Sequence, residues 1–282
     1  MHVVIATLLT LSAWGSPDGP VVTMEAAPVL SQVAPGGTMP VAVRFTIPEA
    51  WHIYWKDAGT AGVATELRVK APPNVKIGPV RYSRPMSIDD PAGVVLGYER
   101  TALLVFNAKV DSTITADEWV ELTVEASWMV CKKACYLGSG RVHVRFAVNQ
   151  ATASPGPGKA WLEAASIPKP LTATQAKVTL RPGVLELQLG SGIPAPAFIL
   201  FHVPGVEVQP ARFDQQEGRT IMRIPYRLSH RDAMGHAPVL SGLLTQGTSV
   251  KDSCWWVDIP LPSPVETGGS ALTNDAQGEP EP

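Results

Sequence analysis

The sequence is poor in cysteine, has almost no net charge and lacks long internal apolar runs. Its three cysteines are not needed as a scaffold, because 282 residues are enough for two domains with apolar cores of their own. The 23 Lys and Arg residues stand against 25 Asp and Glu residues, a formal net charge of -2, so there is no broad positive field. We therefore exclude nucleic acid and anionic membrane surfaces as partners.

Motifs of several enzyme classes are also missing. The sequence contains no Ser/His/Asp set, paired-carboxylate motif or phosphate-cradling glycine loop, which argues against hydrolases and nucleotide-binding enzymes. The pair Cys131 and Cys135 has no second Cys/His pair at a spacing that suits zinc. We expect no cofactor and no resident metal.

Proline (27) and glycine (24) are abundant and spread along the chain, which breaks long helices and favours short strands joined by turns. The composition therefore predicts an all-β protein. Only the N-terminus carries a targeting pattern, an apolar stretch followed by small residues, so residues 1–18 are predicted to be a signal peptide and the protein to be exported. No other stretch stays apolar over the roughly 18 residues that a membrane span needs.

Alternating apolar and polar residues predict two β domains. Residues 19–150 are expected to form an immunoglobulin-like sandwich, residues 151–170 a linker, residues 171–263 a second, smaller sandwich-like domain and residues 264–282 a disordered tail. The predicted strands of the first domain include 41–45, 102–110, 120–128 and 141–148, and those of the second include 197–203, 219–228, 239–244 and 254–261.

The pattern Cys131-Lys132-Lys133-Ala134-Cys135 lies between two predicted strands. In an extended chain the two Cα atoms would lie about 13 Å apart, whereas a disulfide needs about 4.4 to 6.8 Å. A tight turn is therefore required for the two sulfurs to bond. A loop this short stabilises a fold by only about 2 kcal/mol, and the two lysines favour the reactive thiolate, so the spacing favours a redox pair over a structural bridge.

Two alternatives stay open on these residues. The bridge can be structural in an interaction module, or the two thiols can bind Cu(I) with help from Met129, His52 or His143 in a copper-tolerance role. Cys254 is the odd cysteine and is read as an inert, half-buried thiol. Its strand parity groups it with Trp256 and away from the core of its own domain.

Three ordered motifs extend the pattern beyond the cysteines. They are Pro48-Glu49-Ala50-Trp51-His52-Ile53-Tyr54-Trp55-Lys56-Asp57-Ala58-Gly59, then Leu96-Gly97-Tyr98-Glu99, then Ser127-Trp128-Met129-Val130 ahead of the cysteine pair. Together they resemble the N-terminal domain of DsbD-type thiol:disulfide interchange proteins and the related ScsB-like periplasmic domains. The family's proline two residues after the second cysteine is replaced by Leu137.

The resemblance implies a periplasmic relay in which Cys131 and Cys135 cycle between dithiol and disulfide. Electrons would come from a membrane donor of the DsbD/ScsB transmembrane type, present as a separate protein. They would pass to periplasmic thioredoxin-like or disulfide isomerase clients. The residues expected to line or cap the pair are His52, Tyr54, Asp89, Asp90, Tyr98, Lys132 and Lys133.

Overall fold

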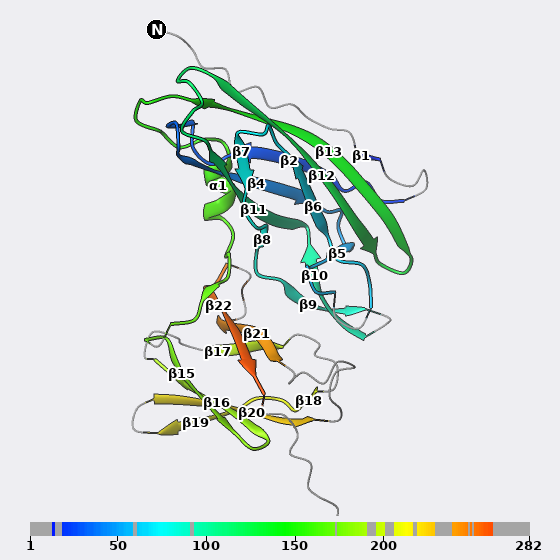
Figure 1. Ribbon diagram of the computed structural model, residues 1–282. Helices are drawn as coiled ribbons and strands as arrows, with labels where there is room; N and C mark the ends of the chain where they lie inside the picture. The colour runs from blue at the N-terminus through cyan, green and yellow to red at the C-terminus, as the bar shows by residue number, and fades with distance from the viewer. Residues whose placement is uncertain are drawn as a thin grey trace, which may run out of the picture.

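The computed structural model describes residues 13–14, 19–58, 61–90, 93–172, 174–190, 196–200, 206–216, 219–228, 239–247, 249 and 251–261. The fold is nearly all β, as the composition predicts, and consists of two β units joined by a short helix (Figure 1). Most of the predicted signal peptide and the whole predicted tail lie outside the described residues. Among the described residues, no helix is long and apolar enough to cross a membrane.

The first unit is an immunoglobulin-like sandwich of two sheets. Within the described residues, one sheet has the order β1-β13-β12-β5-β10-β9, with β3 on β13 and β6 on β12, and the other has the order β2-β4-β11-β7, with β8 on β11. The strands are β1 Ala13–Trp14, β2 Thr23–Pro28, β3 Gln32–Val33, β4 Thr38–Thr46, β5 His52–Tyr54, β6 Glu66–Lys70, β7 Val75–Ile77, β8 Arg81–Tyr82, β9 Met86–Asp90, β10 Gly93–Glu99, β11 Thr101–Val110, β12 Trp119–Cys131 and β13 Cys135–Val148.

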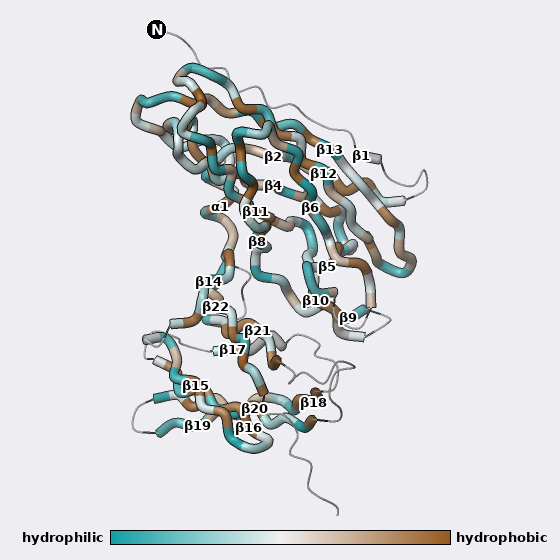
Figure 2. The backbone as a smooth tube through the Cα atoms, viewed as in Figure 1, coloured by the Kyte–Doolittle hydropathy of each residue, from teal (hydrophilic) through white to brown (hydrophobic). Residues whose placement is uncertain are grey.

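Alternation along these strands builds the core between the sheets. In β12, Val120, Leu122 and Val124 are buried while Trp119 and Glu121 are exposed, and the tube in Figure 2 changes repeatedly between hydrophobic and hydrophilic along the strands of this unit. Large side chains such as Phe45, Phe106 and Phe146 are almost completely buried in this core. The first sandwich therefore has a hydrophobic core of its own.

The second unit is smaller and contains the remaining strands. Its two sheets have the orders β14-β22-β21-β17 and β15-β16-β20-β18, with β19 on β20, within the described residues. The elements are α1 Gly158–Glu163, which precedes this unit, and β14 Lys169–Pro170, β15 Ala176–Arg181, β16 Val184–Leu189, β17 Pro196–Leu200, β18 Val206–Val208, β19 Arg212–Gln216, β20 Arg219–Leu228, β21 Val239–Gln246 and β22 Cys254–Pro260.

The strand β13 starts six residues before the predicted strand 141–148. The prediction missed this part because Gly138 and Gly140 interrupt the alternation of apolar and polar residues. Gly138 lies opposite Trp128 in the register of β12 and β13. A Cβ atom at Gly138 would lie 2.3 Å from the indole Nε1 of Trp128, and one at Gly140 would lie 3.1 Å from its Cη2. These glycines leave room for a buried tryptophan, and the resulting long hairpin brings the two cysteines together.

Candidate redox-active disulfide

Cys131 and Cys135 form a disulfide at the tip of the β12–β13 hairpin. Cys131 is the last residue of β12 and Cys135 the first of β13, and the two residues are direct cross-strand partners with Cα atoms 4.2 Å apart. The backbone N–H of Lys132 donates to the carbonyl of Ala134 at 3.2 Å, which closes the turn. The structure thus provides the sharp reversal that the spacing of the cysteines requires.

The two sulfur-bearing residues differ in their exposure. Cys131 is completely buried, whereas Cys135 is exposed together with Lys132, Lys133 and Ala134 of the turn. An incoming thiolate reaches only a sulfur that it can approach from solvent. The geometry therefore makes Cys135 the accessible sulfur and Cys131 the shielded one.

The short strand β5 places two of the predicted lining residues beside the disulfide. His52 is the register partner of Cys131, and Ile53 is the partner of Val130. Partners in an antiparallel pair share a face and successive residues alternate, so His52 and Tyr54 lie on the face of Cys131 while Ile53 enters the core. This face of the sheet points away from the core of the sandwich and carries the candidate site.

Tyr54 makes the closest polar contact to the buried sulfur. Its hydroxyl donates to the Sγ of Cys131 at 3.2 Å. Burial raises the pKa of this hydroxyl, and Asp90, a nearby charge and a second acceptor for the same proton, raises the pKa further. Gly62 lies against the ring, since a Cβ there would be only 2.3 Å from Cε1 of Tyr54. Its φ of +99° also favours glycine at this position. Tyr54 therefore stays protonated at neutral pH and can donate a hydrogen bond to sulfur.

His52 and Asp90 form a second buried polar pair next to Tyr54. The Nε2 of His52 lies 3.4 Å from the Oδ2 of Asp90, and both side chains are buried. The rings of His52 and Tyr54 meet edge to face with centroids 5.2 Å apart. Burial lowers the pKa of His52, although the charges of Asp90 and Glu99 oppose this shift. The disulfide thus has a neutral imidazole and a carboxylate close to its hydrogen-bonding tyrosine.

Apolar side chains enclose the rest of the buried sulfur. Cys131 and Tyr54 form one cluster with Ile88 of β9 and Val95 of β10, and Met86, Met129 and Ala58 pack against it. Val95 and Ile88 are register partners. The hairpin of β9 and β10 therefore covers the side of the disulfide that faces away from the exposed turn.

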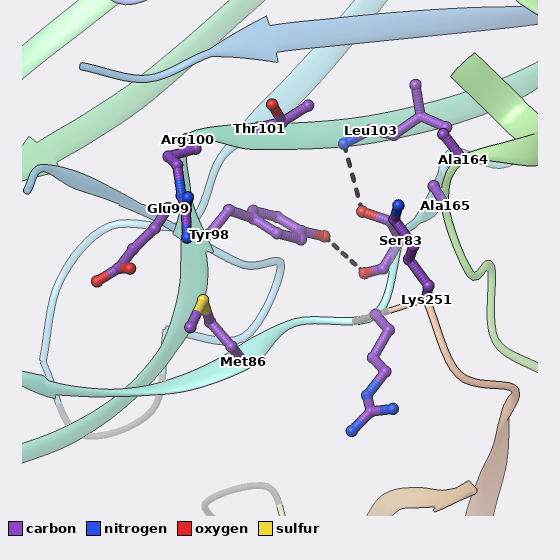
Figure 3. Close-up of a pocket in the computed structure, with 11 residues that line it drawn as sticks. Ser83, Met86, Tyr98, Glu99, Arg100, Thr101, Leu103, Ala164, Ala165 and Lys251 are labelled. Atoms are coloured by element: carbon purple, nitrogen blue, oxygen red, sulfur yellow. Dashed lines mark hydrogen bonds between the residues drawn. The ribbon is translucent and has the colours of Figure 1, made fainter. Parts of the chain in front are cut away.

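Two of the remaining predicted lining residues, Asp89 and Tyr98, lie away from the disulfide. Asp89 is exposed and alternates to the face opposite Asp90. Tyr98 lies in the core, on the face opposite the disulfide, and its hydroxyl donates to the carbonyl of Ser83 at 2.7 Å (Figure 3). Tyr98 lines a cavity of about 400 Å³ that Met86, Arg100 and Lys251 also border. Lys132 and Lys133 occupy the exposed turn.

Ile88, Val95 and Gly62 were not singled out as site residues in the sequence. Ile88 and Val95 are distant from Cys131 along the chain, and the spacing of Gly62 from Tyr54 does not show that the two residues are in contact. The parity of Cys131, His52 and Tyr54 within their strands was the one available signal. Among the described residues, no group of three or more His, Cys, Asp or Glu side chains is arranged to hold a metal ion.

Comparisons with known proteins show what the first unit and the fold are similar to. Residues 20–146 match the family model described as the N-terminal part of the thiol:disulfide interchange protein DsbD. The fold is similar to the crystal structure of the N-terminal periplasmic domain of ScsB from Proteus mirabilis, with 15% identity, a TM-score of 0.59, and coverage of 91% of this chain and 100% of that one.

A second solved structure is the DsbD N-terminal domain of Neisseria meningitidis in the reduced form. It is 18% identical, covers 46% of this chain and 89% of that one, and has a TM-score of 0.26. No curated protein sequence matches the chain.

Proposed function

Because residues 20–146 match the family model of the DsbD N-terminal part, we propose that the protein relays electrons by thiol:disulfide exchange at Cys131 and Cys135. The observation that supports this function best is the asymmetry of the pair. One cysteine is exposed at a hairpin tip, and the other is buried with its sulfur 3.2 Å from a tyrosine hydroxyl. A purely structural bridge has no need of such an arrangement, whereas stepwise exchange requires one sulfur to be attacked and the other to leave.

Reduction of the disulfide proceeds in two exchange steps. A thiolate of the reductant attacks the Sγ of Cys135, the bond between the two sulfurs breaks, and Cys131 leaves as a thiolate. The second thiol of the reductant then attacks the mixed disulfide and releases Cys135. The reductant ends as a disulfide, and the pair has gained two electrons and two protons.

Delivery to a client uses the same sulfurs in the reverse direction. The exposed thiolate of Cys135 attacks a client disulfide and forms a mixed disulfide, and Cys131 resolves it by attacking Cys135. The client leaves with two thiols, and the Cys131–Cys135 bond is restored. Each partner therefore contacts the molecule at the turn and need not enter the buried side of the site.

The residues around Cys131 stabilise the charge that develops on its sulfur. The hydroxyl of Tyr54 can donate to the leaving thiolate, because hydrogen bonds to charged groups are stronger than those to neutral ones. The apolar cluster of Ile88 and Val95 excludes water from that side, which strengthens the hydrogen bond. His52 and Asp90 lie beside Tyr54 and are proposed to orient it.

The partners that we propose are a membrane electron donor of the DsbD/ScsB transmembrane type and thioredoxin-like or disulfide isomerase clients, all meeting in the periplasm. Support comes from the family match and from the similar ScsB domain, which is periplasmic. The side chain of Leu137 also fits a protein partner. Leu137 is 68% exposed and pairs with Met129 on the disulfide face, two residues from Cys135.

Trapping experiments with single-cysteine variants test the function. In Cys131→Ala the exposed Cys135 remains, so we expect it to form a mixed disulfide with an activated thioredoxin-fold protein at least about tenfold faster than the buried Cys131 does in Cys135→Ala. The linked peptide is identified by mass spectrometry. The double variant Cys131→Ala/Cys135→Ala retains Cys254 and measures its background.

Equilibration of the wild-type chain with glutathione buffers measures the reduction potential of the pair. A value between about -270 and -120 mV, the range of exchange proteins, supports the relay. A potential far below about -300 mV would mark a permanent structural bond and contradict the proposed function. Tight 1:1 binding of Cu(I) to the reduced pair, lost in either cysteine variant and without trapping, would favour a copper-binding role instead.

A further inference from the structure

The second β unit packs directly against the chain segments that carry the redox site. Trp55 follows Tyr54 at the end of β5, and its indole stacks on that of Trp256 in β22 with centroids 5.7 Å apart and planes 19° apart. The ammonium of Lys56 lies 4.0 Å above the Trp256 ring and 5.1 Å above the Trp55 ring. Aromatic and cation–π contacts therefore connect the two units one residue away from Tyr54.

The face of β22 that carries Trp256 packs against the first unit. Leu243, the register partner of Trp256, belongs to the core cluster of the first unit. Trp255 and Val257 point the other way, into the core of the second unit. Cys254 shares the face of Trp256 and is 1% exposed, with its Sγ 3.5 Å from the Oγ of Ser166. The parity predicted for Cys254 is thus correct, but the expectation of a half-buried thiol is wrong, because the first unit covers that face and Cys254 is buried.

A second attachment holds the chain ahead of β9. Arg84 is 4% exposed, and its guanidinium donates to the carbonyls of Ser249 and Gly247 at 2.5 and 3.0 Å. Burial lowers the pKa of this guanidinium, and the nearby Cys254 and Asp252 oppose the shift. Two residues later, β9 begins with Met86, which packs against the cluster of Cys131 and Tyr54. Figure 1 shows β22 and β21 on the side of the second unit that faces the first.

We propose that the second β unit is a positioning module for the disulfide, with Trp256 as a positioning residue that acts through Trp55 on Tyr54. This inference rests on the proposed exchange function. Strand β5 is three residues long, and Trp55 extends its pairing through one bond, from its N–H to the carbonyl of Leu96 at 2.9 Å. A strand this short makes few backbone hydrogen bonds, so the packing of its side chains determines its position. Trp256 covers the indole that ends the strand and so keeps the hydroxyl of Tyr54 on Cys131.

The test is a mutant cycle on the full chain, read as the equilibrium constant between disulfide and dithiol in glutathione buffers. Tyr54→Phe removes the hydrogen bond to the Cys131 thiolate and is expected to shift the equilibrium about three- to tenfold toward the disulfide. Trp256→Ala should shift it in the same direction. In the Tyr54→Phe background, Trp256→Ala should add little, because the two residues act on one hydrogen bond.

Two further variants keep the test decisive. Trp256→Leu retains apolar volume but not the stack, and it replaces Trp256→Ala if that variant does not fold. Trp119→Ala is the matched control, since Trp119 is an exposed tryptophan at the far end of β12, and it should leave the equilibrium within twofold of wild type.

The proposal is overturned if folded Trp256 variants leave the equilibrium unchanged, or if their effect persists undiminished with Tyr54→Phe. Failure of the exchange function has a different signature, because the wild-type pair would then resist reduction across all glutathione buffers.

Discussion

At the scale of the residue, the two cysteines are chemically similar but lie in different surroundings. Cys135 is exposed beside two lysines, and Cys131 is enclosed by Ile88, Val95 and Tyr54. The positions of the two cysteines in the sheet produce this difference, because Cys131 pairs with His52 of β5 on one side, whereas Cys135 begins β13 directly after the exposed turn. A site built in this way needs no special backbone conformation at either sulfur.

The buried imidazole of His52 gives a pH prediction. Burial lowers its pKa below the ordinary value of 6.5, so near pH 6 the unfolded chain binds a proton on this side chain more readily than the folded chain does. Stability therefore falls as the pH drops from about 7 through 6.5 toward the lower pKa of the folded state. His52→Gln should reduce this loss in urea unfolding measured between pH 7 and 5.5.

His143→Gln is the control for that measurement, because His143 is an exposed residue of β13. An equal pH dependence in wild type and His52→Gln would refute the assignment to His52. Asp111 and Glu125 also have pKa values that differ from the ordinary ones, but both are lowered from about 4, so they titrate below the pH range of the experiment.

At the scale of the element, much of the strand pattern is predictable from the sequence. Strand β20 has the predicted bounds, and β4, β11 and β12 extend the predicted strands by a few residues. The start of β13 was not predictable from alternation, since Gly138 and Gly140 have no side chains and leave room for Trp128 of the neighbouring strand β12. The lining of the site by β9 was equally hidden, because tertiary packing alone brings Ile88 to Cys131.

The exposed leucine of β13 gives a prediction about docking. Leu137→Asp should lower the second-order rate of exchange with reduced thioredoxin about tenfold, because an apolar anchor beside the attacked sulfur is lost. The rate with dithiothreitol should stay within twofold of wild type, since a small thiol does not cover Leu137. Stopped-flow mixing with each reductant measures both rates.

Trp119→Asp serves as the comparison for Leu137→Asp, because it places the same charge at an exposed apolar position at the far end of the hairpin. Equal losses of rate with thioredoxin and with dithiothreitol would show that Leu137 affects the chemistry of the disulfide and not the docking of a protein.

At the scale of the whole molecule, the two units share a buried interface that the sequence did not reveal. Trp55 and Trp256 are 201 positions apart in the chain, and the alternation within their strands does not indicate that they meet. The buried guanidinium of Arg84 adds charge-assisted hydrogen bonds to the same interface.

Removal of that guanidinium gives a stability prediction. Arg84→Met leaves the carbonyls of Gly247 and Ser249 without their donors, which costs about 2 kcal/mol or more of unfolding free energy. Because the hydrogen bonds of Arg84 connect the two units, urea unfolding of the variant should show two separate transitions. Tryptophan fluorescence and circular dichroism measure them. Arg223→Met removes two partly exposed ion pairs inside the second unit, with Glu186 and Asp214, and should cost less than about 1 kcal/mol for each pair. A single transition with wild-type stability in Arg84→Met would contradict this role.

The cross-strand register of β12 and β13 runs without a break from Trp119 opposite Ala147 to Cys131 opposite Cys135. Breaking the disulfide therefore removes none of this backbone pairing. The reduced chain can keep the backbone conformation of the oxidised chain. An electron carrier with this hairpin changes its backbone very little between the oxidised and reduced states. Its reduction potential is therefore set by the few side chains around the Sγ of Cys131.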